Sequence, residues 1–188
     1  TGESAGPIER LWELPEALKI LKKQQADGSW RRAGKQKHTA INFGLIETWR
    51  WLRVLVDQYG FNRSHPQAAL AAEFLFSCQT KAGDFRGILA NQYATYYSGA
   101  ILALLVRMGY VEDERIDSSF AWLLAMRQDD GGWTIPMLTH KLDRATQYRL
   151  TSQHATPLEP IRSLPFSHNW TGMVLRAFAD HPRYRQTD

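Results

Sequence analysis

The sequence predicts an all-α protein built from helical hairpins, and two recurring features of the chain support this prediction. A glutamine, a glycine-containing turn and an aromatic residue occur together three times, as Gln25 to Trp30, Gln79 to Phe85 and Gln128 to Trp133. The copies start about 50 residues apart, a spacing typical of helical repeat proteins. An apolar stretch centred on a glycine follows each turn, and two features that recur in phase indicate three copies of one unit. The three central glycines are Gly44, Gly99 and Gly172.

The first unit is expected to contain two helices. One covers 7–25, where Pro7 stands near the start and leucines recur at helical spacing. Gly28 marks its end, because glycine adopts a positive φ without strain. The other covers about 38–59 and stops at Gly60.

The second unit is expected to show how the helices are layered. Pro66 opens a third helix that runs to Gln79, and residues 93–108 form a fourth. The fourth helix is apolar on nearly every side, so it must be enclosed by protein. We therefore expect the helices with a central glycine to form an inner layer, because glycine permits close approach of a neighbour. The helices that end in a glutamine turn form the outer layer.

The third unit differs from the others by a long insertion. Asp117 or Ser118 can cap a fifth helix over roughly 118–128, and a sixth helix begins near Ser167. The intervening residues 137–166 are polar and without period, so we expect a long loop that is either functional or poorly ordered. The three units then cover about 7–60, 61–110 and 111–184 of a single domain over 1–188.

Composition limits the class of protein. With 188 residues, of which 44% are hydrophobic, the chain can bury one sizeable core. No stretch reaches the roughly 18 consecutive apolar residues of a transmembrane segment. The net charge of +4 accompanies no basic stripe interleaved with aromatics, so no nucleic-acid partner is expected. Cys78 is the only cysteine, which excludes an internal disulfide and indicates a reducing compartment such as the cytoplasm, including its membrane surfaces.

The glutamine, turn and tryptophan pattern resembles the QW repeat of squalene–hopene cyclases and related triterpene cyclases. The helical pairs are also similar to those of the wider αα-toroid group, which includes the protein prenyltransferases. The resemblance implies an (α/α) toroid in which the glutamine and the aromatic residue are structural. It implies that role for Gln25 with Trp30, Gln79 with Phe85 and Gln128 with Trp133, although Phe85 replaces the usual tryptophan.

The resemblance also bears on assembly. Toroids of this group close with five to seven helical pairs, so three pairs form about half a ring. The ring is then expected to be completed either by a second copy, as a homo-oligomer, or by a further segment of a longer chain.

The catalytic motifs of the family are missing from the sequence. No Asp-x-Asp-Asp acid of the cyclases occurs, and the adjacent Asp129 and Asp130 belong to the third turn. The zinc ligands of the prenyltransferases have no counterpart either, since Cys78 stands in an outer helix. We therefore expect no metal and no cofactor. If the chain catalyses a reaction, the acid must come from outside this segment or from His38, Glu47 or His168.

The starts of the inner helices are the predicted binding site. Asn42, Tyr97 and Trp170 each stand two positions before a central glycine, and Tyr93 and Tyr96 lie beside them. Aromatic walls suit a carbocation or the face of a sugar. The alternative is that these rings only fill the space between helices. A separate anion site is expected at Arg31, Arg32 and Lys35, which precede the start of an inner helix; its alternative is a solvated charged loop.

Three functions follow as hypotheses. The first is binding of an isoprenoid-like hydrophobic molecule, with cyclisation by a squalene-cyclase-like isomerase or lyase mechanism if residues outside this chain complete the site. The second is a glycan-processing lyase or hydrolase, which predicts a hydrated cleft with an acid and a base. The third is a non-catalytic repeat scaffold, which predicts a filled centre and an exposed apolar edge.

Overall fold

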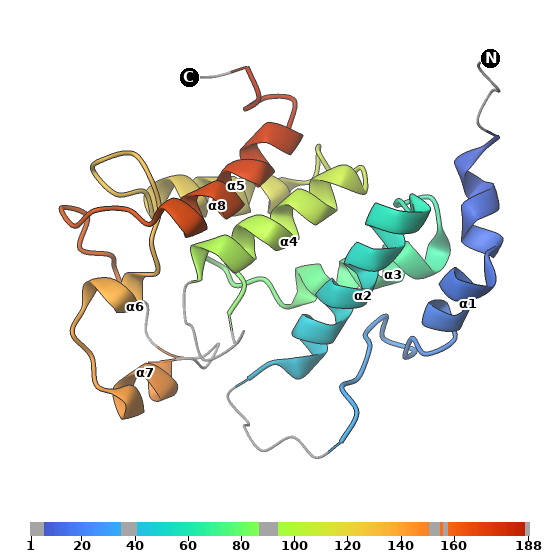
Figure 1. The fold of residues 1–188 in the computed structure, drawn as a ribbon, viewed down its shortest axis with the longest axis horizontal. Helices are drawn as coiled ribbons and strands as arrows, with labels where there is room; N and C mark the ends of the chain where they lie inside the picture. The colour runs from blue at the N-terminus through green and yellow to red at the C-terminus, as the bar shows by residue number, and fades with distance from the viewer. Residues whose placement is uncertain (1–5, 35–40, 87–93, 151–154, 156–157, 187–188) are drawn as a thin grey trace.

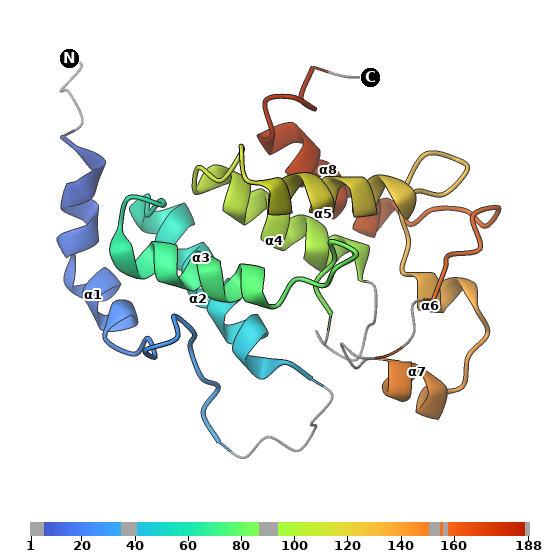
Figure 2. The same cartoon turned by 180° about the vertical axis from the view of Figure 1, so that it is seen from behind.

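The computed structural model describes residues 6–34, 41–86, 94–150, 155 and 158–186. Within these ranges the chain forms nine helices and no β-strand, so the all-α prediction is confirmed (Figures 1 and 2). The helices are η1 (Ile8–Glu13), α1 (Pro15–Leu21), α2 (Phe43–Tyr59), α3 (Pro66–Ser77), α4 (Thr95–Arg107), α5 (Glu114–Ala125), α6 (Pro136–Thr139), α7 (Arg144–Leu150) and α8 (His168–Asp180).

Several helix boundaries differ from the sequence-based prediction. α2 was expected from about residue 38 but begins at Phe43, after the non-helical Ile41 and Asn42. The helix expected over 7–25 is divided into η1 and α1, because Pro15 forces Leu14 into the extended region, with φ −63° and ψ 138°. α5 begins one turn earlier than expected, capped by the Asp113 carboxylate, which accepts a hydrogen bond from the Arg115 N–H at 3.0 Å. The expected loop 137–166 contains the short helices α6 and α7.

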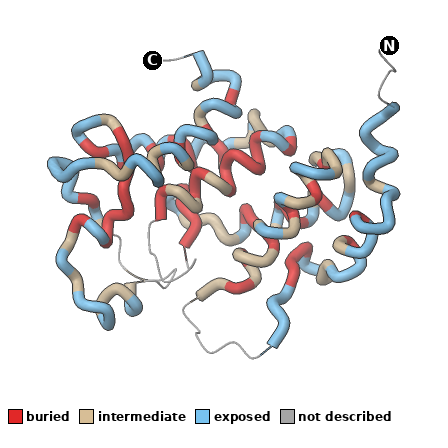
Figure 3. The backbone as a smooth tube through the Cα atoms, in the orientation of Figure 1, coloured by how far each residue is buried: buried red, intermediate tan, exposed pale blue. Residues whose placement is uncertain are grey.

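α4 is the most deeply buried helix of the fold. It packs against α8, α5 and α2, and nine of its thirteen residues are buried; the buried residues are red in Figure 3. Gly99 permits the close approach of α8, since a Cβ at this position would lie 3.0 Å from the Cα of Val174. Gly172 has open space around it instead, so the prediction that it admits a neighbour is wrong.

The three glycine turns share one hydrogen-bond pattern and one length. In each, the first residue donates its N–H to the carbonyl of the fifth, at 2.8, 2.9 and 2.8 Å. Gln79 therefore precedes its turn and corresponds to Gln24, whereas Gln25 is the first residue of its own turn. The five-residue turns are 25–29, 80–84 and 128–132.

The side chains of Gln24 and Gln79 join the first two turns to α3 and α5. The Gln24 amide donates to the carbonyls of Gly28 at 3.0 Å and of Gln67, in the first turn of α3, at 2.8 Å. Gln79 does the same with Gly83, at 3.2 Å, and with Arg115 in α5, at 2.8 Å. Gln79 thus joins the end of α3 to the start of α5.

Gln25 does not make the predicted contact with a neighbouring helix. Its side chain donates to the carbonyl of Lys23 at 3.2 Å, because the residue before it, Gln24, faces α3. Gln128 has the same position in its turn but reaches farther, and donates to the carbonyls of Ile161 at 2.9 Å and Leu164 at 2.8 Å. The end of the long insertion therefore lies where α3 and α5 lie for the first two turns.

The aromatic residue after each turn is buried and fixes the helix that comes next. The backbone N–H groups of Trp30, Phe85 and Trp133 donate to hydroxyl oxygens in α2, α4 and α8. The two indoles also donate backwards, from Trp30 to Ile20 at 3.0 Å and from Trp133 to Leu123 at 2.6 Å. The accepting hydroxyls are those of Thr48 (3.0 Å), Ser98 (3.1 Å) and Thr171 (2.8 Å).

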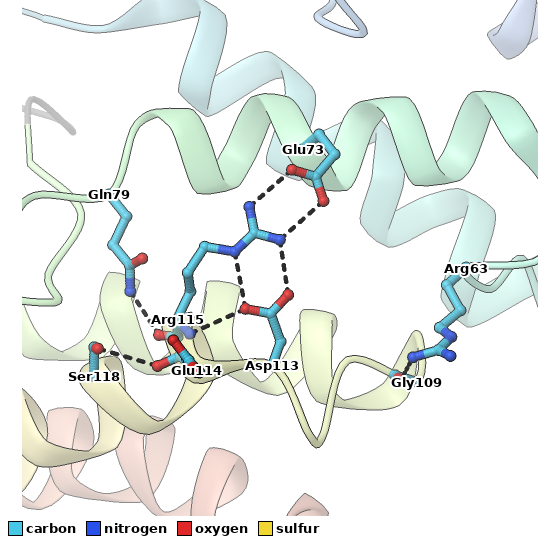
Figure 4. A network of polar contacts seen from close by, with 8 residues as sticks. All are labelled: Arg63, Glu73, Gln79, Gly109, Asp113, Glu114, Arg115 and Ser118. Atoms are coloured by element: carbon cyan, nitrogen blue, oxygen red, sulfur yellow. Dashed lines mark hydrogen bonds and ion pairs between the residues drawn. The ribbon is translucent and has the colours of Figure 1, made fainter.

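A polar network connects α3 with α5 (Figure 4). The Arg115 guanidinium donates to both carboxylate oxygens of Glu73, at 2.8 and 2.9 Å, and to those of Asp113. It also lies 3.7 Å from the centre of the Phe76 ring. Hydrogen bonding to Arg115 lowers the pKa of Asp113.

The second turn also contains a buried ion pair. Asp84 is fully buried and receives two hydrogen bonds from Arg86, at 2.7 and 3.1 Å, and one from the Thr80 hydroxyl. Arg86 in turn donates to the carbonyl of Ala155 at 3.5 Å. The pair thus joins the second turn to the long insertion.

The described part of the chain contains no helix of sufficient length and apolar character to cross a lipid bilayer.

Two of the turn glycines lie directly against the backbone of a helix. A Cβ on Gly28 would lie 2.3 Å from the carbonyl oxygen of Leu70 in α3, and one on Gly83 would lie 2.3 Å from that of Ser118 in α5. The nearest neighbour of a Cβ on Gly131 is the end of the Arg127 side chain, at 3.1 Å. All three glycines have positive φ, of 86°, 101° and 96°.

We therefore predict two classes of glycine substitution. Gly131→Ala is expected to lower the free energy of unfolding by about 1 kcal/mol, the strain of a positive φ. Gly28→Ala and Gly83→Ala add a clash with helix backbone and are expected to cost about 3 kcal/mol each. Urea unfolding followed by circular dichroism measures all three. Equal losses of unfolding free energy in all three variants would contradict the close contacts that Gly28 and Gly83 make with α3 and α5.

His65 is expected to make the stability depend on pH. Its ring packs against Trp12 and Phe61, and its Nδ1 is buried with no hydrogen-bond partner among the described residues. Burial lowers its pKa below the ordinary 6.5. The unfolded chain then binds a proton more readily, so the free energy of unfolding falls as the pH drops below about 6.5. In urea titrations at pH 7.5 and 5.5, His65→Phe is expected to lose less stability than the parent chain. The same loss in both would exclude His65 as the source.

Candidate functional site

A groove runs between α2, α4 and α8, with a volume of about 100 Å³. The hydroxyl residues Thr48, Ser98 and Thr171 align these helices, since each accepts the N–H of a turn aromatic. The residues that line the groove are Trp49, Arg53, Asp57, Ala100, Ala103, Arg107, Met173, Arg176 and Asp180.

One end of the groove is closed by an ion-pair network. Asp57, Arg107 and Asp180 each stand nine positions after the hydroxyl residue of their helix. The guanidinium of Arg107 lies between the two carboxylates, 2.6 Å from Asp57 and 3.4 Å from Asp180. The charge of Arg107 is therefore neutralised within the protein.

The middle of the groove is cationic. Arg53 and Arg176 stand five positions after the hydroxyl residues of α2 and α8, and the corresponding residue of α4 is the small, buried Ala103. In the part of the chain that the structure describes, neither arginine has a carboxylate partner within 4.0 Å. Both guanidinium groups are exposed, and that of Arg53 lies 4.9 Å from the centre of the Trp49 ring.

Aromatic rings gather beyond the other end of the groove. Tyr96 stacks on Trp170 with 6.0 Å between ring centres and contacts Tyr97 at 4.3 Å. Tyr97 in turn meets Trp49 edge-on at 5.6 Å. Burial raises the pKa of Tyr97, so this hydroxyl stays protonated at neutral pH. Three of the predicted binding residues therefore do lie together.

Asn42 is not part of this aromatic cluster. Its side-chain oxygen caps α2 by accepting the N–H of Leu45 at 2.9 Å, and its amide lies 3.6 Å from the Cys78 sulfur. The hydrogen-bond alignment makes Glu47, not Asn42, the counterpart of Tyr97 and Trp170, because the glycine spacing differs in the first unit.

The remaining predicted residues lie apart from the groove or outside the described ranges. Arg31 and Arg32 are exposed, with Arg32 over the ring of Phe43 at 4.8 Å, and His168 is exposed against Phe166. Glu47 pairs with Arg50 at 3.7 Å. His38, Tyr93 and Lys35 lie outside the described residues.

The sequence pattern did not single out the two groove arginines, because the expected site lay at the helix starts. Arg53 and Arg176 lie in the middle of their helices, where a charged residue is usually interpreted as part of the solvent-exposed face. A usable signal existed: once the hydroxyl residues are aligned, the ninth position after them is charged in α2, α4 and α8, and the fifth is an arginine in α2 and α8. That alignment requires the hydrogen bonds of the turns, which the glycine spacing alone does not reveal.

Among the described residues, no three histidine, cysteine or carboxylate side chains come together as a metal site. Comparison with known protein families, with curated sequences and with solved structures finds no match to this chain.

Proposed function

We propose that the chain is a row of three αα-hairpin repeats that forms part of a toroid similar to that of terpenoid cyclases. The shared turns support this proposal. Each turn fixes the helix that follows through a hydroxyl, and the first two are also tied to the next helix of the outer row. In this arrangement α2, α4 and α8 form the inner layer, and the groove lies on the side that faces the centre of the ring.

The function proposed for this groove is binding of an isoprenoid-like molecule that carries an anionic head group. The observation that carries the proposal is the order of the groove, which runs from aromatic rings to two guanidinium groups that have no carboxylate partner among the described residues. Aromatic and apolar side chains suit a hydrocarbon chain, and arginine suits a phosphate or carboxylate. The head group would lie between Arg53 and Arg176, above the space left by Ala103.

The ion-paired end of the groove sets the direction of the ligand. The carboxylates of Asp57 and Asp180 would repel an anion beyond the two arginines. The apolar chain must then extend toward Trp49, Met173 and the aromatic cluster. No residue of the groove is an isolated acid, so we propose binding and assign no catalytic step to this chain.

An acidic glycan is the second candidate. The stacked rings of Tyr96 and Trp170 could hold the face of a sugar, and carboxylates and guanidinium groups alternate in the groove next to them. This arrangement would suit a short oligosaccharide of uronic acids.

We further propose that another helical pair, from a second copy or from a further chain segment, packs beside the third unit. The side chains that bond to the turn glycines belong to Gln24, Gln79 and Arg127. Three positions before them stand Leu21, which is 4% exposed, Phe76, which is 5% exposed, and Leu124, which is 42% exposed. Light scattering of the chain is expected to give a mass above that of one copy. A stable monomer would leave only the further segment as the source of the missing pair.

The binding proposal is tested by calorimetric titration with geranylgeranyl diphosphate and with the uncharged geranylgeraniol. Replacing both Arg53 and Arg176 by alanine is expected to raise the Kd of the diphosphate at least about tenfold, because two charge-assisted contacts are lost. The alcohol should change by less than about twofold, since it makes neither contact.

A double variant with Arg10→Ala and Arg185→Ala serves as the control, because it removes the same charge from exposed positions outside the groove. Equal weakening by both double variants would show only a general effect of charge and would contradict the proposal. Binding of trigalacturonate in preference to the diphosphate would favour the glycan. Binding of neither would favour a scaffold.

A further inference from the structure

A second pocket, of about 210 Å³, lies between α1 and α2. Its walls are the side chains of Ile20, Trp30 and Trp51. The Trp30 indole N–H donates to the carbonyl of Ile20, so Trp30 offers the pocket only apolar surface. Charged side chains stand around the apolar walls, namely those of Lys19, Lys23 and Glu16.

The other two units fill the corresponding space with their own side chains. The turn contacts align Gln24 with Gln79 and with Arg127, whose side chain also donates to its turn glycine, at 2.7 Å. Counting back from these residues, the position of Lys19 is taken by Phe74 and Trp122, and that of Lys23 by Cys78 and Met126. The first unit thus has two ammonium groups where the others have apolar or aromatic groups.

The start of α2 covers this space in the second unit. A Cβ on Gly44 would lie 3.3 Å from the Phe74 ring, and the Asn42 amide lies 3.6 Å from Cys78. A helix start carries a positive partial charge from its free N–H groups. Lys19 and Lys23 would repel such a helix start, so the occupant of this pocket differs in charge from that of its counterpart.

We propose that this pocket binds a small aromatic acid, with its ring between Trp30 and Trp51 and its carboxylate on Lys19 and Lys23. An apolar cavity of about 150 Å³ holds a benzene ring, so this volume accommodates one ring with a short acidic arm. The ring takes the place that Phe74 and Trp122 hold in the other units. Glu16 disfavours a second carboxylate on the ligand, because it places a negative charge at the same pocket.

The test uses ligand-observed NMR of the 188-residue chain with 3-phenylpropionate and its neutral amide. The acid is expected to bind with a Kd on the order of 1 mM, and the amide roughly fivefold more weakly. Lys19→Phe supplies the ring that the other units have, so it should abolish binding of both probes. Lys23→Glu should weaken the acid at least about fivefold and leave the amide unchanged.

Lys22→Glu is the matched control, since it makes the same charge change on an exposed neighbour that does not line the pocket. It is expected to bind the acid within about twofold of the parent. Thermal unfolding shows whether Lys19→Phe is folded, and Lys23→Glu decides the question independently if it is not. Undiminished binding by folded Lys19→Phe, or equal effects of Lys22→Glu and Lys23→Glu, would overturn the proposal. Failure of the acid to bind would overturn it as well, without bearing on the groove between α2, α4 and α8.

Discussion

The buried aromatic residue after each turn is the interaction on which the rest of the fold depends. Its backbone N–H is bonded to a hydroxyl of the next helix, and in two cases its indole N–H is bonded to the helix before. One residue therefore has both its backbone and its indole donor satisfied and holds two helices together at once. Each of α2, α4 and α8 is held through one such hydroxyl, and the residues five and nine positions after it line the groove in all three helices.

The sequence predicted the helices better than it predicted which residues of one helix correspond to which residues of the next. The five helices of twelve residues or more were predicted from glycine stops, proline starts and apolar spacing, because these signals are local. The break at Leu14, in contrast, was missed. Leu14 is extended because Pro15 follows it, and the leucines continue at helical spacing across this break. The alignment failed at Gly44, since glycines mark any close approach and are not tied to one place in a repeat. The hydroxyl residues are tied to one place, but a lone serine or threonine in a helix gives no such signal.

The candidate site shows a similar division. Tyr96, Tyr97 and Trp170 could be grouped from the sequence, because helix starts in neighbouring units lie at the same end. The roles of Asn42 and Glu47 could not, since both depend on which partner a polar side chain finds in space. Charge in the groove depends in the same way on pairing: Arg107 is neutralised by two aspartates, and Arg53 is not.

The buried pair of Asp84 and Arg86 has a consequence for how this chain can change over evolutionary time. Losing one member leaves an uncompensated charge in the interior, which costs about 3–5 kcal/mol, whereas replacing both by apolar residues is often nearly neutral. Single substitutions at either position therefore lead through a poorly folded intermediate. Among descendants of this sequence, positions 84 and 86 should be inherited as a couple, either both charged or both apolar, and seldom mixed.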